Sequence, residues 1–227
     1  PVRFRLVLGC RELPEADSAN VIGEVTGTER PREVVLLGAH LDAWDLGTGA
    51  LDDGAGVSIV LTTAQNLLRA PTPPRRTVRV VLFANEENGL AGARAYAASH
   101  AEELPSHTAA LEADAGDGRV LEIRFTGGAE GRGAFQRLAA MVRPMGVRAS
   151  DERAHGGADL SPLEGVPRFD LAQDMSTYFD HHHTANDTPA VLDEPALHHA
   201  VAVWTRVVAE LASMPDALGR APPAERH

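Results

Sequence analysis

Short apolar runs alternate along the chain with longer amphipathic stretches, which is the pattern of strands that are each followed by a helix. Apolar runs bounded by turn residues predict strands, and we expect them at residues 4–8, 20–26, 34–39, 77–84, 108–113, 120–125 and 166–171. Apolar residues at helical spacing predict helices at residues 53–69, 90–100, 134–142 and 195–212. This order favours an α/β fold, a three-layer α/β/α sandwich with a mixed, largely parallel central sheet.

We expect one domain over residues 1–227, because no repeat and no second domain is evident in the pattern. The chain begins at Pro1 rather than at methionine and leads directly into an apolar run, so we expect that a segment precedes it. No apolar run has the length of a membrane span, and there is no signal-peptide pattern.

The stretch at residues 38–56, GAHLDAWDLGTGALDDGAG, stands between a predicted buried strand and a predicted helix. Ligand sites in open α/β sheets collect at the carboxyl ends of strands. A polar, glycine-spaced loop at such a place is more often a site than a simple connection. This stretch is therefore the first candidate for a functional loop.

Composition narrows the function classes. The formal net charge is −11, and the 21 basic residues form no long run, which disfavours nucleic-acid binding. An acidic balance suits a protein that gathers carboxylates around a cation, although most of the excess is expected on the solvated surface. The single cysteine, Cys10, excludes a disulfide within the chain.

Polar clusters recur at the ends of the predicted strands. They are HLD with the later DD pair, NEEN at residues 85–88, EAD at residues 112–114, and FDHHHTANDT at residues 179–188. Imidazole nitrogen and carboxylate oxygen are the ordinary ligands of zinc where no thiolate is used, and a catalytic zinc site keeps one position open. Clusters from separate strand ends that carry these groups predict a zinc site.

Ordered motifs carry a resemblance to a known family. The segments GAHLDAWDLGTGALDDGAG, NEENGLAGA, LEADAG, GGADLSPLEGVP and YFDHHHTANDT are similar to the successive motifs of the di-zinc exopeptidase family. That family contains secreted bacterial aminopeptidases and plasma glutamate carboxypeptidases, and the loop around the DD pair is most like the latter. The resemblance covers roughly residues 20–212.

The resemblance implies two zinc ions per chain and assigns their ligands. It implies that Asp52 bridges both ions, that Glu87 and His183 complete one shell, and that His40 and Asp114 complete the other. His183 is selected from the histidine triplet by its spacing to the Asp-Thr pair that follows.

Other positions receive supporting roles. Asp42 would hold the second ring nitrogen of His40 through its carboxylate, and a turn-forming residue is the alternative for it. Asp53 would be structural, with a cis peptide bond between Asp52 and Asp53. Glu86 would stay free of metal as the general base for a water shared by the two ions. His182 stands where some relatives have a tyrosine, so it is either an oxyanion-stabilising group or a structural histidine.

The implied function is a zinc-dependent exopeptidase that acts on dipeptides or short peptides with a free amino terminus. A glutaminyl-cyclase-type transferase on the same fold and a catalytically inactive receptor or scaffold domain are the alternatives. The anchor for the substrate amino group stays open, with Asp159 and Glu112 as candidates. The resemblance also implies a secreted or periplasmic location and makes a homodimer plausible, with no nucleic-acid partner.

Overall fold

The computed structural model describes residues 2–11 and 13–222. Within these residues the central sheet has seven strands in the order β1-β3-β2-β4-β7-β5-β6. The strands are β1 Val21–Val25, β2 Arg30–His40, β3 Arg76–Phe83, β4 His107–Glu112, β5 Val120–Thr126, β6 Arg148–Ala149 and β7 Arg168–Gln173. β3, β2, β4 and β7 run parallel to one another, whereas β1 and β5 pair antiparallel with β3 and β7. The sheet is therefore mixed and largely parallel, as predicted.

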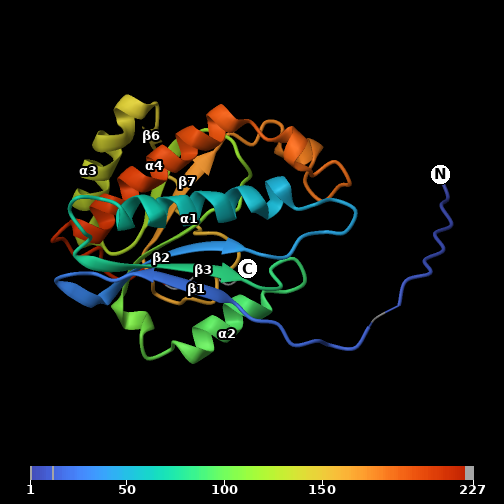
Figure 1. The fold of residues 1–227 in the computed structure, drawn as a ribbon, viewed down its shortest axis with the longest axis horizontal. Coiled ribbons are helices and arrows are strands. Elements are labelled where there is room, and N and C mark those ends of the chain that lie inside the picture. The colour runs from blue at the N-terminus through green and yellow to red at the C-terminus, as the bar shows by residue number, and fades with distance from the viewer. Residues whose placement is uncertain (1, 12, 223–227) are drawn as a thin grey trace.

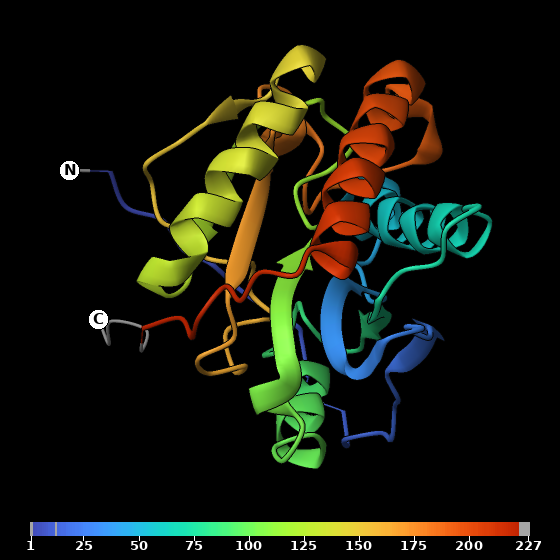
Figure 2. The same ribbon diagram turned by 90° about the vertical axis from the view of Figure 1, so that its left-hand side faces the viewer.

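Helices cover both faces of the sheet. The four α-helices are α1 Ala55–Leu68, α2 Ala91–Ser99, α3 Arg132–Val142 and α4 Glu194–Ser213. α1, α3 and α4 lie on one face and α2 lies on the other, which gives the predicted three layers (Figures 1 and 2). Short 3₁₀ turns occur at Leu104–Ser106, Ala129–Gly131, Arg143–Met145, Tyr178–Asp180 and Pro189–Val191.

The central strand β2 shows why the middle of the sheet requires an uninterrupted run of apolar residues. Side chains alternate between the two faces of a strand, so Val35 and Leu37 pack toward α1 and α4 while Val34 and Leu36 pack toward α2. All four are at most 3% exposed. A strand that is covered on both faces needs apolar residues at every position.

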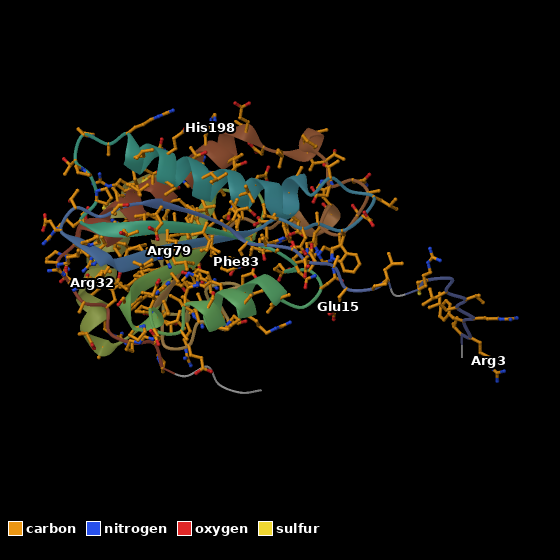
Figure 3. All side chains as sticks on the ribbon, turned by 60° about the horizontal axis from the view of Figure 1, so that its bottom comes forward. Arg3, Glu15, Arg32, Arg79, Phe83 and His198 are labelled. Atoms are coloured by element: carbon orange, nitrogen blue, oxygen red, sulfur yellow. The ribbon has the colours of Figure 1, made fainter. Side chains whose placement is uncertain are left out.

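The N-terminal segment differs from its prediction. The strand expected at residues 4–8 does not form, and Phe4 and Leu8 are 91% and 69% exposed. The segment extends away from the sheet, with Arg3 far from the other labelled side chains (Figures 1 and 3). Backbone amides and carbonyls of a strand need a neighbouring strand, and in the described residues this segment has none. Alternation of side chains alone did not reveal that lack.

The other boundaries shift by a few residues. The helix expected to start at residue 53 starts at Ala55, and the irregular turn Ala50–Gly54 precedes it. The two-residue strand β6 was not predicted, because two residues are too few to show a periodic pattern. No helix within residues 2–11 and 13–222 combines the length and the apolar character that crossing a membrane requires.

We expect the buried side chains of β2 to contribute strongly to the stability of this fold. Leu36 is 0% exposed, whereas Leu61 on α1 is 47% exposed. Leu36→Ala should lower the free energy of unfolding by about 2–5 kcal/mol through lost burial and a residual cavity. Leu61→Ala is the matched control and should change it by less than about 1 kcal/mol. Chemical denaturation of both variants measures the difference, and equal losses would contradict this description of the core.

Candidate metal centre

The predicted site residues meet at one edge of the sheet, where the parallel strands end. His40 is the last residue of β2, Glu86 and Glu87 lie in the turn after β3, and Asp114 follows β4. Asn85 has a φ of 64°, in the left-handed region, so the backbone leaves the strand direction immediately before the two glutamates. Both glutamates can therefore face the same site, although neighbours on a regular strand point to opposite faces.

The turn Ala50–Gly54 presents the aspartate pair. Asp52 and Asp53 have non-helical backbone angles inside this turn, and the peptide bond between them is cis, as the resemblance implied. Gly56 begins the first turn of α1 against the end of β4. A Cβ atom there would lie 1.9 Å from the carbonyl oxygen of Ala113 and 2.2 Å from a carboxylate oxygen of Asp53. Only glycine permits this approach of helix and strand.

Asp187, which is distant in sequence, binds the same turn. Its two carboxylate oxygens accept the backbone amides of Leu51 at 2.6 Å and of Asp52 at 3.1 Å. Asp187 is 4% exposed, so these bonds are shielded from water. The sequence marked Asp187 only by its spacing to the histidines, and the structure adds this anchoring contact. The aspartate turn is thus fixed by the loop that carries His182 and His183.

Asp52 lies between His40 on one side and the neighbouring residues His182 and His183 on the other. Its Oδ1 atom lies 3.2 Å from Nε2 of His40, and its Oδ2 atom lies 3.2 Å from Nε2 of His183 and 3.3 Å from Nε2 of His182. The carboxylate is 4% exposed. One buried carboxylate therefore directs its two oxygens toward two separate sets of nitrogen atoms, which is the arrangement of a bridging ligand.

Each side of Asp52 contains a further carboxylate. On one side, Nε2 of His40 lies 3.6 Å from Oδ1 of Asp114. On the other side, Nε2 of His183 lies 2.9 Å from Oε2 of Glu87. The structure thus brings together all five predicted ligands, in two groups that share Asp52.

These residues fit zinc. Four ligands at zinc bond lengths of about 2.0–2.2 Å stand roughly 3.3–3.6 Å from one another, close to the separations seen here. Three groups have ligand atoms that all lie within 4.8 Å of one another: His40, Asp52 and Asp114; Asp52, His182 and His183; and His40, Glu86 and Glu87. The donors are imidazole nitrogens and carboxylate oxygens, which zinc accepts. The geometry leaves both His182 and His183 within reach of Asp52.

Electrostatics favour a cation at the same place. Burial lowers the pKa of His40, but hydrogen bonds to Asp114 and Asp52 and the surrounding negative charge outweigh it and raise that pKa to about 12. The pocket therefore draws a positive charge onto His40. A divalent ion that takes the place of this proton would supply the charge that the carboxylates require.

Two aspartates support His40 in different ways. Asp53 is 2% exposed and accepts the amides of His40 at 3.0 Å and Gly56 at 3.1 Å, which agrees with the structural role expected of it. For Asp42, the nearest partner of the His40 Nδ1 atom is the backbone carbonyl, at 3.0 Å, whereas the carboxylate lies 3.9 Å away. The Asp42 carboxylate instead accepts the amides of Glu86 at 2.9 Å and Glu87 at 3.2 Å. This differs from the contact predicted for it: Asp42 ties the two glutamates to His40.

Glu86 lies at the cavity beside the predicted ligands. Burial raises the pKa of its carboxyl group, and the charges of Asp114, Glu87 and Asp42 raise it further, against the lowering effect of His40. Glu86 lines a cavity of about 420 Å³ together with Asp52, Glu87, Asp114, Tyr178, Phe179, His182 and His183. The side chain therefore faces the space in which a substrate would lie.

Sequence reasoning did not single out Tyr178 and Phe179 as site residues. Both belong to the short turn Tyr178–Asp180 and line the cavity. The Tyr178 ring lies 4.8 Å from that of His182, and the Phe179 ring lies 5.5 Å from it. The spacing of Tyr178 four residues before His182, about one helical turn, was the signal that could have found it.

Asp159 does not contact the cavity. It is 0% exposed, and neither of its carboxylate oxygens has a hydrogen-bond partner among the described residues. Burial and the nearby charge of Glu86 raise its pKa to about 7. In this structure its carboxylate lies behind the site, out of reach of a substrate amino group.

Comparisons with known proteins identify similar sequences and structures. The family model described as Peptidase family M28 matches residues 20–208. Human carboxypeptidase Q is 34% identical over 220 residues, which cover 96% of this chain and 46% of that protein. The crystal structure of a peptidase M28 precursor from Shewanella amazonensis superposes with a TM-score of 0.87 at 44% identity, covering 90% of this chain and 47% of that one.

A more distant structure shares the fold alone. The zinc aminopeptidase BSAP from Bacillus subtilis has a TM-score of 0.68 at 20% identity, covering 86% of this chain and 50% of that one. The chain spans about half the length of these relatives.

We expect Asp187 to be needed for the shape of the aspartate turn. Asp187→Ala leaves the amides of Leu51 and Asp52 without their partner, at roughly 1–3 kcal/mol for each buried amide, and should weaken zinc binding as Asp52 moves. Asp180 is exposed and serves as the matched control through Asp180→Ala. Thermal unfolding and zinc content measure both effects. Unchanged values for Asp187→Ala would contradict the anchoring role.

The buried Asp159 predicts a pH-dependent gain in stability. Its folded pKa of about 7 lies above the ordinary value of 3.8, so the stability that its proton confers is lost as pH rises through about 7. Asp159→Asn carries no charge and should therefore raise the melting temperature of the metal-free protein more at about pH 8 than at about pH 5. Calorimetry at the two pH values tests this, and an equal effect at both would refute it.

Proposed function

The chain belongs to peptidase family M28, and on this basis we propose that it is the zinc-binding catalytic part of an exopeptidase. Its substrates would be dipeptides or short peptides with a free amino terminus. One observation carries the proposal: the two oxygens of Asp52 face His40 on one side and His183 on the other, each at 3.2 Å. A carboxylate between two nitrogen donors is the ligand that a pair of metal ions shares.

The proposed ligands divide around Asp52. One zinc ion would be held by Asp52, His40 and Asp114, and the other by Asp52, Glu87 and His183. When bound, the two ions would lower the pKa of a water molecule and stabilise negative charge on the carbonyl oxygen of the scissile bond. Three carboxylates against two divalent cations leave a small positive excess, which suits the development of negative charge in the substrate.

Glu86 would move the proton. As a carboxylate in the cavity it accepts a proton from the attacking water, and as a carboxylic acid it returns that proton to the leaving amine. The amide of Glu86 is fixed by Asp42, which keeps the carboxylate directed into the cavity. Peptide hydrolysis then needs no covalent bond between the chain and the substrate.

Two side chains are candidates for contact with the carbonyl oxygen. His182 lines the cavity with its Nε2 atom 3.3 Å from the Asp52 carboxylate, and the ring of Tyr178 lies 4.8 Å from the His182 ring. Both can donate a hydrogen bond. Some relatives have a tyrosine at the position of His182. Tyr178 therefore offers, close by, the phenol that this chain lacks at that position. The stabilising contact would come from this pair of neighbours.

Several finer expectations stay predictions. The relatives carry the names carboxypeptidase and aminopeptidase, and the proposed preference for a free amino terminus does not decide between a dipeptidase and an aminopeptidase. The homodimer and the secreted or periplasmic location likewise stay predictions. For the chain, the proposed partner is the peptide substrate.

Glu86→Gln tests the proposed function. The variant should retain two zinc ions per chain and lose kcat for dipeptide hydrolysis by about 10²–10⁴-fold, because glutamine cannot accept the proton. Glu194, 81% exposed on α4, provides the control Glu194→Gln, which should hydrolyse normally. Elemental analysis and a dipeptide panel give both readouts.

The same assay separates the alternatives. Wild-type protein with two zinc ions but no hydrolysis would favour the inactive-domain alternative. Cyclisation of an amino-terminal glutamine peptide with a single zinc ion would favour the transferase. Full activity of Glu86→Gln would show that another group takes the proton.

A further inference from the structure

Trp44 lies in the loop that follows β2, and both of its contacts fall on one side of Asp52. We propose that Trp44 is a positioning residue that holds Glu87 and His183 in ligand geometry for one of the two metal positions. The inference rests on the proposed zinc site. It assigns a role to a loop residue that takes no part in the proposed chemistry.

The contact with Glu87 is a hydrogen bond. Nε1 of Trp44 donates to Oε2 of Glu87 at 2.6 Å, across 43 residues of sequence. The same Oε2 atom lies 2.9 Å from Nε2 of His183. A carboxylate oxygen has two lone pairs, so one can accept the indole N–H while the other faces the metal position. The Glu87 side chain is 5% exposed, so its carboxylate has little access to bulk water as an alternative donor.

The contact with His183 is between rings. The centroids of Trp44 and His183 lie 5.3 Å apart at 44°, and the His183 ring is also stacked on His182 with centroids 3.6 Å apart. His183 also has a φ of 58°, in the left-handed region that side-chain-bearing residues seldom adopt. The imidazole therefore contacts two rings, and Trp44 provides one of them.

Core packing does not account for the position of Trp44. The side chain is 48% exposed, whereas the other tryptophan, Trp204, is 1% exposed in the core. A half-exposed indole gains only part of the stabilisation that a fully buried one gains. Within the described part of the chain, its hydrogen bond and its ring contact are both made with proposed ligands, which is the arrangement of a residue that orients metal-binding side chains.

The other metal position is supported by different residues. His40 is held through Asp42 and Asp53 and faces Asp114. Loss of the Trp44 contacts should thus weaken one position and spare the other. Removing the hydrogen-bonding partner of a metal ligand typically lowers metal affinity by about 10–100-fold.

Two variants separate the hydrogen bond from the ring contact. Trp44→Phe removes the N–H donor and keeps an aromatic ring beside His183, and Trp44→Ala removes both. Leu46, in the same loop and 86% exposed, supplies the control Leu46→Ala. Each protein is equilibrated across a series of buffered free zinc concentrations, and bound zinc per chain is measured by elemental analysis. Thermal unfolding of the metal-free proteins checks that the variants remain folded.

We expect wild type and Leu46→Ala to give the same two-ion binding curve. In Trp44→Phe, half of the binding should move to roughly 10–100-fold higher free zinc while the other half stays in place, and Trp44→Ala should move it further. Tryptophan emission should change with zinc in wild type, and much less in Trp44→Phe, which retains only the buried Trp204. Melting temperatures of the metal-free proteins should agree.

Two results would overturn the inference alone, with the proposed function intact: a Trp44→Phe curve that coincides with a two-ion wild-type curve, or an equal shift of both halves. A wild-type chain that binds no zinc and cleaves no dipeptide would overturn the proposed function and this inference together. Dipeptide hydrolysis by wild type in the same buffers distinguishes the two failures.

Discussion

Both oxygens of one buried carboxylate, that of Asp52, face imidazole nitrogens on opposite sides, and the other ligands are arranged around this contact. For Asp52 to do so, its turn must leave helical geometry, and Asp187 must hold the turn in place through two backbone amides. Hydrogen bonds from His40, together with the charges of His40, His182 and His183, outweigh burial and lower the pKa of Asp52. The carboxylate is therefore kept ionised in a place where water could not stabilise it.

The sheet provides the other part of the constraint. Parallel strands bring their carboxyl ends to one edge, so three separate connections deliver His40, Glu87 and Asp114 to the same few ångströms. The supporting contacts are also shared between connections. Asp42, which follows β2, binds the amides of the turn after β3. The same side chain thus fixes the relative position of two ligand-bearing loops.

The sequence predicted the scaffold and the ligands better than the contacts that hold the ligands. Apolar runs buried on both faces predicted β2 and β3, and polar residues after strand ends predicted a zinc site at that edge. The family resemblance assigned His40, Glu87 and Asp114 as ligands and Glu86 as the general base. The prediction of a strand at residues 4–8 was wrong. A strand needs a neighbouring strand, and the alternation of side chains along the sequence does not reveal whether one is present.

The roles of Asp187 and Trp44 depend on loops that meet only in the fold. Their contacts join residues far apart in sequence, 136 residues in the case of Leu51 and Asp187. No local pattern indicates such a pairing. The resemblance assigned Asp42 to His40, but which of its oxygens would meet His40 depended on the turn after β3.

The ligands come from segments scattered between residues 40 and 183 of a chain that has one cysteine. An ion held by Asp52, Glu87 and His183 would close two long loops of the polypeptide, and constraining long loops in the unfolded chain is how covalent cross-links stabilise proteins. The metal positions would thus act as reversible cross-links in place of disulfides. The resistance of the folded protein to proteolysis would then depend on the free zinc concentration, as the proposed catalytic activity would.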